Sequence, residues 1–122
     1  MSKTILVVDD SSSLRTAVRI ALSGAGFEVV EAEDGKQALT KLDGRKYHLV
    51  ISDVNMPNLD GFGFVTAMKQ MAAYKYTPVI MLTTEAGDDK KEKGRAAGAK
   101  AWIVKPFLPP QLLSVVSNLV MP

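Results

Sequence analysis

The feature that most constrains the fold of this chain is an apolar run that ends abruptly in an acid. Residues 49–51 read Leu-Val-Ile with no polar residue between them, which is typical of a strand buried on both faces. Asn55 and Pro57 then interrupt the pattern, so Asp53 is predicted at or just beyond the carboxyl end of that strand. In open α/β sheets, ligands bind at this edge.

A second stretch has the same design. Residues 5–8 read Ile-Leu-Val-Val and are followed by Asp9 and Asp10. If the two strands are neighbours, these carboxylates and that of Asp53 converge on one small volume. Because like charges that close raise each other's pKa, the arrangement predicts a divalent cation and a lysine that balance the charge.

Composition limits the class of protein. With 122 residues, 47% hydrophobic and 23% charged, residues 1–122 are predicted to form a single domain. The absence of cysteine excludes disulfides and thiolate metal sites and is typical of a cytoplasmic protein. No apolar run reaches the ~18 residues of a membrane span, and the first residues lack the form of a signal peptide. A net charge of +2 without a basic, aromatic stripe does not indicate nucleic-acid binding.

Periodicity predicts five strands alternating with five helices. The strands are expected at 4–8, 27–30, 48–52, 79–82 and 101–104, and the helices begin near residues 11, 34 and 60 or span 88–97 and 110–120. This alternation is typical of an α/β fold with a parallel sheet covered on both faces. The pattern leaves the strand order open, although the acids suggest that the first and third strands are adjacent.

Two more strands deliver polar residues to the same edge, because Thr83 follows strand 79–82 and Lys105 follows strand 101–104. Mg²⁺ binds through one or two carboxylates together with phosphate oxygens. A carboxylate can also act as a nucleophile and form an aspartyl phosphate. The cluster therefore favours Mg²⁺-dependent phosphoryl transfer, with lysine and hydroxyl groups stabilising the transferring oxygens.

These motifs resemble the receiver domain of two-component response regulators, and most closely the single-domain, CheY-like chemotaxis regulators. The residues that carry the resemblance are Val8-Asp9-Asp10, Asp53 with Met56-Pro57, Asp60-Gly61, Thr83 and Lys105-Pro106-Phe107. The resemblance implies a flavodoxin-like (βα)5 three-layer sandwich whose five parallel strands run in the order 2-1-3-4-5.

It also implies a role for each acid. Asp53 is expected to accept a phosphoryl group from a sensor histidine kinase or a histidine phosphotransfer protein. Asp10 and Asp53 are expected to ligate Mg²⁺ together with the backbone carbonyl of Asn55, and Asp9 to act through a metal-bound water.

The same resemblance assigns the remaining site residues. Lys105 is expected to contact the phosphoryl group, from a cis peptide bond to Pro106 that aims it back at the site. Thr83 is expected to report phosphorylation and Trp102 to follow it as the switch. Most family members carry Tyr or Phe in place of Trp102, so its larger ring leaves open how far it turns inward.

Three rival interpretations remain. The first is a haloacid-dehalogenase-like phosphatase, but those enzymes carry a second Asp two residues after the nucleophile, where this chain has Asn55. We therefore expect a signalling domain that removes its own phosphoryl group slowly, and not an enzyme. In a flavodoxin-like electron carrier, Asp9 and Asp10 would repel the FMN phosphate. The chain could be cut from a longer DNA-binding regulator, although the Met1 start and the lack of a linker favour a stand-alone protein.

The last two helices are expected to form the output surface. Gly94 within helix 88–97 is predicted to cost about 1 kcal/mol against Ala, and the apolar face of that helix has little beyond Ala96 and Ala97. The apolar positions of helix 110–120 span about 160°, wider than the ~100° that one-sided packing needs; they are Leu112, Leu113, Val115, Val116, Leu119 and Val120. Part of this apolar arc should therefore be exposed to solvent, where it could bind a target protein such as a motor switch or another effector. A phosphatase is a further possible partner.

Overall fold

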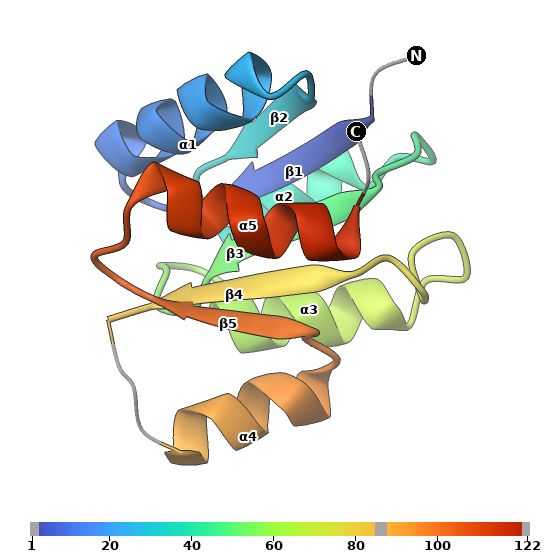
Figure 1. The fold of residues 1–122 in the computed structure, drawn as a ribbon. Coiled ribbons are helices and arrows are strands. Elements are labelled where there is room, and N and C mark those ends of the chain that lie inside the picture. Colours follow the sequence, from blue (N-terminus) through green and yellow to red (C-terminus); the bar gives the residue numbers. More distant parts are fainter. Residues whose placement is uncertain (1–2, 85–87, 121–122) are drawn as a thin grey trace.

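A computed structural model describes residues 3–84 and 88–120, in which strands and helices alternate (Figure 1). The strands are β1 (Thr4–Val8), β2 (Glu28–Ala32), β3 (Leu49–Asp53), β4 (Val79–Thr83) and β5 (Ala101–Val104). The helices are α1 (Ser12–Gly24), α2 (Gly35–Lys41), α3 (Gly61–Lys69), α4 (Asp88–Ala97) and α5 (Pro109–Leu119). The predicted alternation of elements is confirmed.

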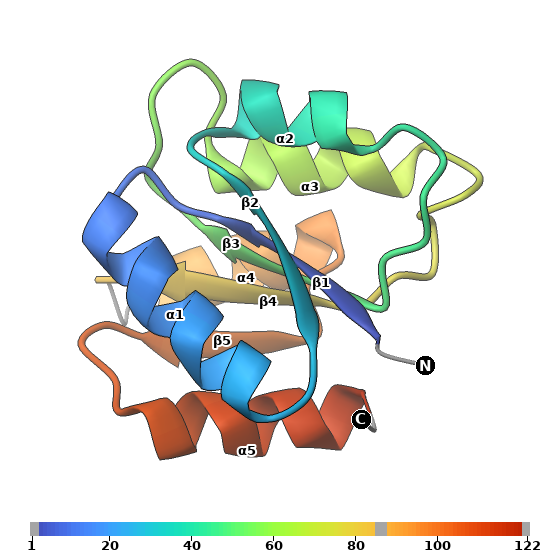
Figure 2. The same ribbon diagram turned by 90° about the horizontal axis from the view of Figure 1, so that it is seen from above.

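The five strands form one parallel sheet in the order β2-β1-β3-β4-β5. The predicted adjacency of β1 and β3 and the expected three-layer flavodoxin-like fold are therefore confirmed. Helices α1 and α5 cover one face of the sheet, and α2, α3 and α4 cover the other (Figure 2). Each face has its own hydrophobic core, and every residue of β3 and β4 is buried.

The boundaries of β2, β3 and β4 differ from the prediction, β4 by extending one residue to Thr83, and local contacts account for the differences at β2 and β3. The amide of Phe27 donates to the carbonyl of Leu22 at 3.1 Å, so Phe27 belongs to the turn that closes α1, and β2 begins one residue later and extends to Ala32. Strand β3 runs to Asp53, because Asp53 still pairs with Leu82 of β4. The phosphoacceptor candidate is thus the last residue of a buried strand.

Three helices begin at a residue whose side chain caps the first turn. These N-caps fix the ends of the loops at the carboxyl edge of the sheet. The Ser11 hydroxyl accepts from the amide of Leu14 at 3.2 Å, Asp34 accepts from Gln37 at 2.7 Å, and Asp60 accepts from Gly63 at 2.8 Å. Such caps satisfy amides that have no partner within the helix. They anchor the loops that follow β1, β2 and β3.

Gly94 has a different role from the one expected. Among residues 91–97 of α4, whose burial is described, Gly94 is the buried one, whereas Ala96 is exposed and Ala97 is half-buried. A Cβ added at position 94 would lie 2.6 Å from Cζ3 of Trp102. The expectation for Gly94 considered helix propensity alone, whereas the close approach of the Trp102 ring also leaves no room for a side chain at this position.

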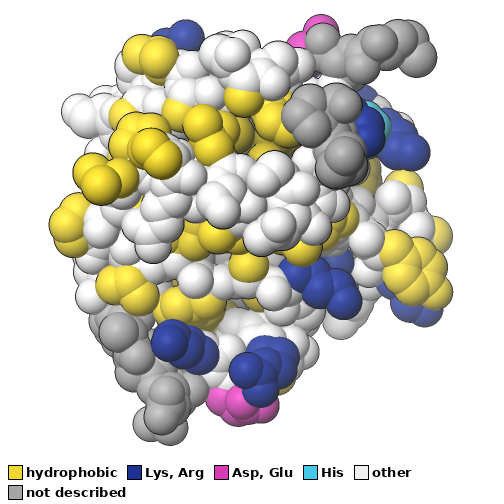
Figure 3. Space-filling view, in the orientation of Figure 1, with side chains coloured by type: hydrophobic (Ala, Val, Ile, Leu, Met, Phe, Trp, Pro, Cys, Tyr) yellow, Lys and Arg dark blue, Asp and Glu magenta, His cyan; other side chains and the backbone are white. Residues whose placement is uncertain are grey.

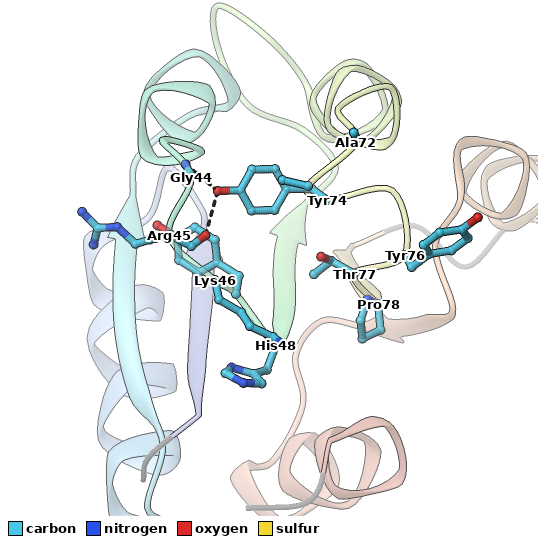
Figure 4. Close-up of a pocket in the computed structure, with 11 residues that line it drawn as sticks. Gly44, Arg45, Lys46, His48, Ala72, Tyr74, Tyr76, Thr77 and Pro78 are labelled. Atoms are coloured by element: carbon cyan, nitrogen blue, oxygen red, sulfur yellow. Dashed lines mark hydrogen bonds between the residues drawn. The ribbon is translucent and has the colours of Figure 1, made fainter.

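A hollow of about 430 Å³ lies at the other end of the sheet (Figure 4). It is lined by residues 44–48 and by residues 72–78 except Lys75, which precede β3 and β4. The Tyr74 hydroxyl joins the first segment to the core, accepting from the amide of Gly44 at 3.0 Å and donating to the carbonyl of Arg45 at 2.7 Å. Being at the amino edge of the strands, the hollow is not part of the acidic cluster. No helix among the described residues is long and apolar enough to cross a bilayer.

Candidate phosphoryl-acceptor and metal site

The register of the sheet brings the three predicted acids together. Val8 of β1 pairs with Ser52 of β3, so the next residues, Asp9 and Asp53, lie level at the carboxyl edge. Carboxylate oxygens of Asp9, Asp10 and Asp53 lie within 4.8 Å of one another. Asp9 and Asp53 are buried and Asp10 is exposed, so the cluster opens to solvent on the side of Asp10.

Lys105 bridges the two buried acids. Its Nζ lies 2.9 Å from Oδ2 of Asp9 and 3.1 Å from Oδ1 of Asp53. The residue directly follows β5, and its amide donates to the carbonyl of Thr83 on the neighbouring strand at 2.6 Å. The Lys105–Pro106 peptide is cis, as the family resemblance implied.

Burial and charge act on these groups in opposite directions. Burial raises the pKa of Asp53 above its usual 3.8, and the nearby charge of Asp9 raises it further, although Lys105 acts to lower it. Burial acts to lower the pKa of Lys105, but the hydrogen bond and charge of Asp9, followed by those of Asp53, outweigh this effect and raise it. The carboxylate of Asp53 thus lies in a site where additional positive charge is favourable.

The donor set fits a hard divalent cation. Carboxylate oxygens are the ligands that Mg²⁺ prefers, and Mg²⁺ retains several waters, which the exposed side of the cluster can admit. Oδ1 of Asp9 accepts from the amide of Ser11 at 2.9 Å while Oδ2 pairs with Lys105. Each Asp9 oxygen therefore already has one protein partner, and the expected contact of Asp9 with the metal through water stays a prediction. Asn55 is exposed just beyond β3, and its carbonyl stays a predicted ligand.

The two predicted switch residues lie on adjacent strands. Thr83 is buried at the end of β4, beside β5, and Met81 of β4 pairs with Trp102. The Trp102 ring is half-buried beneath α4 and stacks on Phe62 with centroids 6.4 Å apart. Within the described residues, its Nε1 is buried without a hydrogen-bond partner.

Sequence reasoning missed one contact at the site and one contact between the loops that follow β2 and β3. The Arg15 guanidinium donates to the backbone carbonyl of Asp9. The Asn58 side chain, on the loop that follows β3, donates to Oδ2 of Asp34 at 2.8 Å. Asn58 has a positive φ of 70°, a conformation that Asn tolerates better than most residues, so the presence of Asn in this loop is the signal that the sequence offered.

The family model of the response regulator receiver domain matches residues 5–117. The chain belongs to this family. It is 41% identical over 107 residues to the chemotaxis protein CheY1 of Helicobacter pylori, covering 86% of each chain. It is also similar to the structure of the Vibrio cholerae chemotaxis protein CheY4, with 45% identity, a TM-score of 0.94, and coverage of 98% of this chain and all of the other.

A third similar structure bears on the metal. The receiver domain of the sensor histidine kinase PA1611 from Pseudomonas aeruginosa carries a magnesium ion coordinated in its active-site cleft. It is 25% identical, has a TM-score of 0.89, and matches 98% of each chain. Receiver domains bind Mg²⁺ in this cleft, and the corresponding fold here places three acids together. The fold is that of a signalling domain of the chemotaxis type.

Proposed function

We propose that this chain acts as a response regulator whose Asp53 accepts a phosphoryl group in a Mg²⁺-dependent step. The single observation that carries the proposal is the position of the Lys105 ammonium, 2.9 Å from Asp9 and 3.1 Å from Asp53. A buried carboxylate beside a fixed cation, at the open edge of a sheet, is arranged to receive an anionic group.

The donor is a phosphohistidine of a sensor histidine kinase or a histidine phosphotransfer protein. An Asp53 carboxylate oxygen attacks phosphorus, the phosphorus–nitrogen bond breaks, and its electron pair stays on the donor imidazole. Lys105 pairs with the phosphoryl oxygens, and the Thr83 hydroxyl donates to another of them. When bound by Asp10, Asp53 and the Asn55 carbonyl, Mg²⁺ supplies further charge stabilisation.

Slow loss of the phosphoryl group follows from the residues around Asp53. Two positions after the nucleophile, Asn55 provides no carboxyl that could act as a general acid or base. Hydrolysis therefore depends on a water that no acid of this loop activates. This supports a signalling role, with a separate phosphatase as a further partner.

The output surface is the face formed by α4, β5 and α5. On α5, Leu113, Val115 and Leu119 are half-buried, whereas Leu112 and Val116 are buried, which fits an arc wider than the core needs. Figure 3 shows hydrophobic side chains flanking α5 and basic side chains gathered over α4. Such a surface suits an effector, for example a component of a motor switch, that offers apolar and acidic groups.

Intact mass spectrometry tests the phosphoacceptor. Incubation with a small acyl phosphate and Mg²⁺ should add one phosphoryl group to the wild type and none to Asp53→Asn. Asp43→Asn, a change in an exposed loop acid, is the matched control and should be phosphorylated as the wild type is. An Asp53→Asn variant that gains a phosphoryl group on another aspartate would refute the assignment.

A further inference from the structure

Arg15 connects α1 to the acidic cluster by a contact that the proposed chemistry does not use. Its Nη1 donates to the backbone carbonyl of Asp9 at 2.5 Å, and its Nε lies 3.3 Å from Oε1 of Glu31 on β2. The Arg15 side chain is only 16% exposed. A planar guanidinium can donate in both directions at once, which the single ammonium of lysine does not reproduce.

The carbonyl that Arg15 holds belongs to the peptide unit joining Asp9 to Asp10. Because the peptide is planar, fixing this oxygen also fixes the plane of the Asp10 amide and the position of the Asp10 Cα, from which the side chain extends. Asp9 has further anchors, since its amide donates to Ala32 and its carboxylate pairs with Lys105 and the amide of Ser11. The exposed Asp10 depends more on the orientation of the peptide itself.

We propose that Arg15 is a positioning residue that sets the direction of Asp10 and thereby the affinity of the site for Mg²⁺. The inference rests on the metal site of the proposed function. Glu31 completes the arrangement, because its two carboxylate oxygens pair with Arg15 and Arg19 and hold the Arg15 side chain against β2. Residues that orient the ligands of a metal typically change its affinity 10- to 100-fold when removed.

Positioning and simple charge predict effects of opposite sign. Arg15 is positively charged and lies near the proposed Mg²⁺ site, so it repels the ion. By this repulsion alone, removal of Arg15 would strengthen Mg²⁺ binding. If Arg15 orients Asp10, its removal weakens binding. Arg19 is a matched control, because it pairs with the same Glu31 at 3.2 Å, whereas the described contact to the Asp9 carbonyl comes from Arg15.

The experiment measures the dissociation constant of Mg²⁺ by NMR titration of the backbone amides, together with thermal unfolding in EDTA. Arg15→Met should bind Mg²⁺ about tenfold more weakly than the wild type, and Arg19→Met should bind it equally or more tightly. Arg15→Lys keeps the charge and is the second variant if Arg15→Met does not fold; it too should bind Mg²⁺ more weakly, because the compact ammonium does not reproduce the fixed fork of the guanidinium.

Mg²⁺ binding by Arg15→Met or Arg15→Lys that matches or exceeds the wild type would overturn the positioning role. An equal loss in Arg19→Met would also overturn it, because the loss of Mg²⁺ affinity would then not depend on the contact between Arg15 and the Asp9 carbonyl. A wild type that binds no Mg²⁺ would refute the proposed metal site itself, an outcome distinct from a failure of Arg15 alone.

Discussion

Gly94 of α4 lies so close to the Trp102 ring of β5 that a Cβ at position 94 would come within 2.6 Å of Cζ3. The ring is also stacked on Phe62 of α3, at an interplanar angle of 23°. Trp102 is thus held between two helices, and the glycine sets how closely α4 can approach the sheet. The position of α4 in the proposed output face therefore depends on this pair.

Gly94→Ala should fail to give the stabilisation that helix propensity predicts. An exposed site would gain about 1 kcal/mol, whereas forcing a methyl group against the ring costs about 1–3 kcal/mol. Urea unfolding should show an unchanged or lower stability, with altered Trp102 emission. Gly24→Ala, at the end of α1 with no heavy atom within 4 Å of the added Cβ, is the control and should not destabilise. A Gly94→Ala gain equal to the helix-propensity value would contradict the packing.

Lys105→Met should destabilise the metal-free protein, because it leaves Asp9 and Asp53 as neighbouring buried charges without their shared cation. Breaking a buried ion pair costs several kcal/mol, and we expect about 3 kcal/mol at pH 7. The loss should shrink at pH 5, since the pKa of Asp53 is already raised by burial and by Asp9. Urea unfolding at both pH values measures this. Lys100 is an exposed lysine next to β5, and Lys100→Met should change the stability little. A loss of stability in Lys100→Met as large as in Lys105→Met would mean that the net charge of the protein, and not the contact with the two acids, is responsible.

Mg²⁺ should stabilise the wild type against heat by linkage, by about 2.7 kcal/mol at a hundredfold excess over its dissociation constant. Asp10→Ala should abolish this increment, because it removes a ligand and leaves the buried pair with Lys105 intact. Thermal unfolding with and without Mg²⁺ provides the comparison. If Asp10→Ala responds to Mg²⁺ as the wild type does, the ion binds elsewhere.

Asp34→Asn should lower stability at neutral pH, because both oxygens of Asp34 accept hydrogen bonds at once, from Gln37 and from Asn58. An amide has one acceptor oxygen and cannot replace both. The hydrogen bond from the Gln37 amide, and then that from Asn58, lower the pKa of Asp34 below 3.8. The contribution of the Asp34 carboxylate to the stability of the fold is therefore present above pH 3.8, and it is lost as the pH falls through the lowered pKa of Asp34.

Urea unfolding between pH 7 and pH 3 measures the free energy of unfolding of the wild type and of Asp34→Asn. The difference between the two should be constant above pH 4 and should narrow below it. Asn58→Gly, which keeps the positive φ accessible, should lower stability in the wild type and have less effect in the Asp34→Asn background. A difference that persists unchanged to pH 3 would exclude the carboxylate as its source.

Trp102 fluorescence should report phosphorylation through Thr83. Trp102 is the only tryptophan, and its ring is already half-buried, so we expect a shift in emission from a change of environment when Mg²⁺ and a phosphate-mimicking fluoride complex are added. Thr83→Ala should reduce the shift, and Thr84→Ala, an exposed neighbour, should not. An identical shift without the Thr83 hydroxyl would remove this coupling from the mechanism.

The sequence alone determined the alternation of strands and helices and placed Asp9, Asp10, Asp53 and Lys105 at or just after the carboxyl ends of strands. These features depend on periodicity and on residues adjacent in the chain, which act locally. Because all strands of a parallel sheet end at one edge, local signals were enough to predict that the acids and the lysine converge. The strand order came from the family resemblance, and the register was read from the structure.

Only the tertiary structure decided which side chains meet across the fold. Three contacts depend on how the elements are rotated and how far they lie from the sheet. They are the hydrogen bond of Arg15 to the Asp9 carbonyl, the hydrogen bond of Asn58 to Asp34, and the packing of Gly94 against Trp102. Gly94 shows the limit clearly: the same residue is a weak point of an isolated helix and a requirement of a packed one. The physical reason is that close packing couples residues distant in sequence, while propensity describes each residue alone.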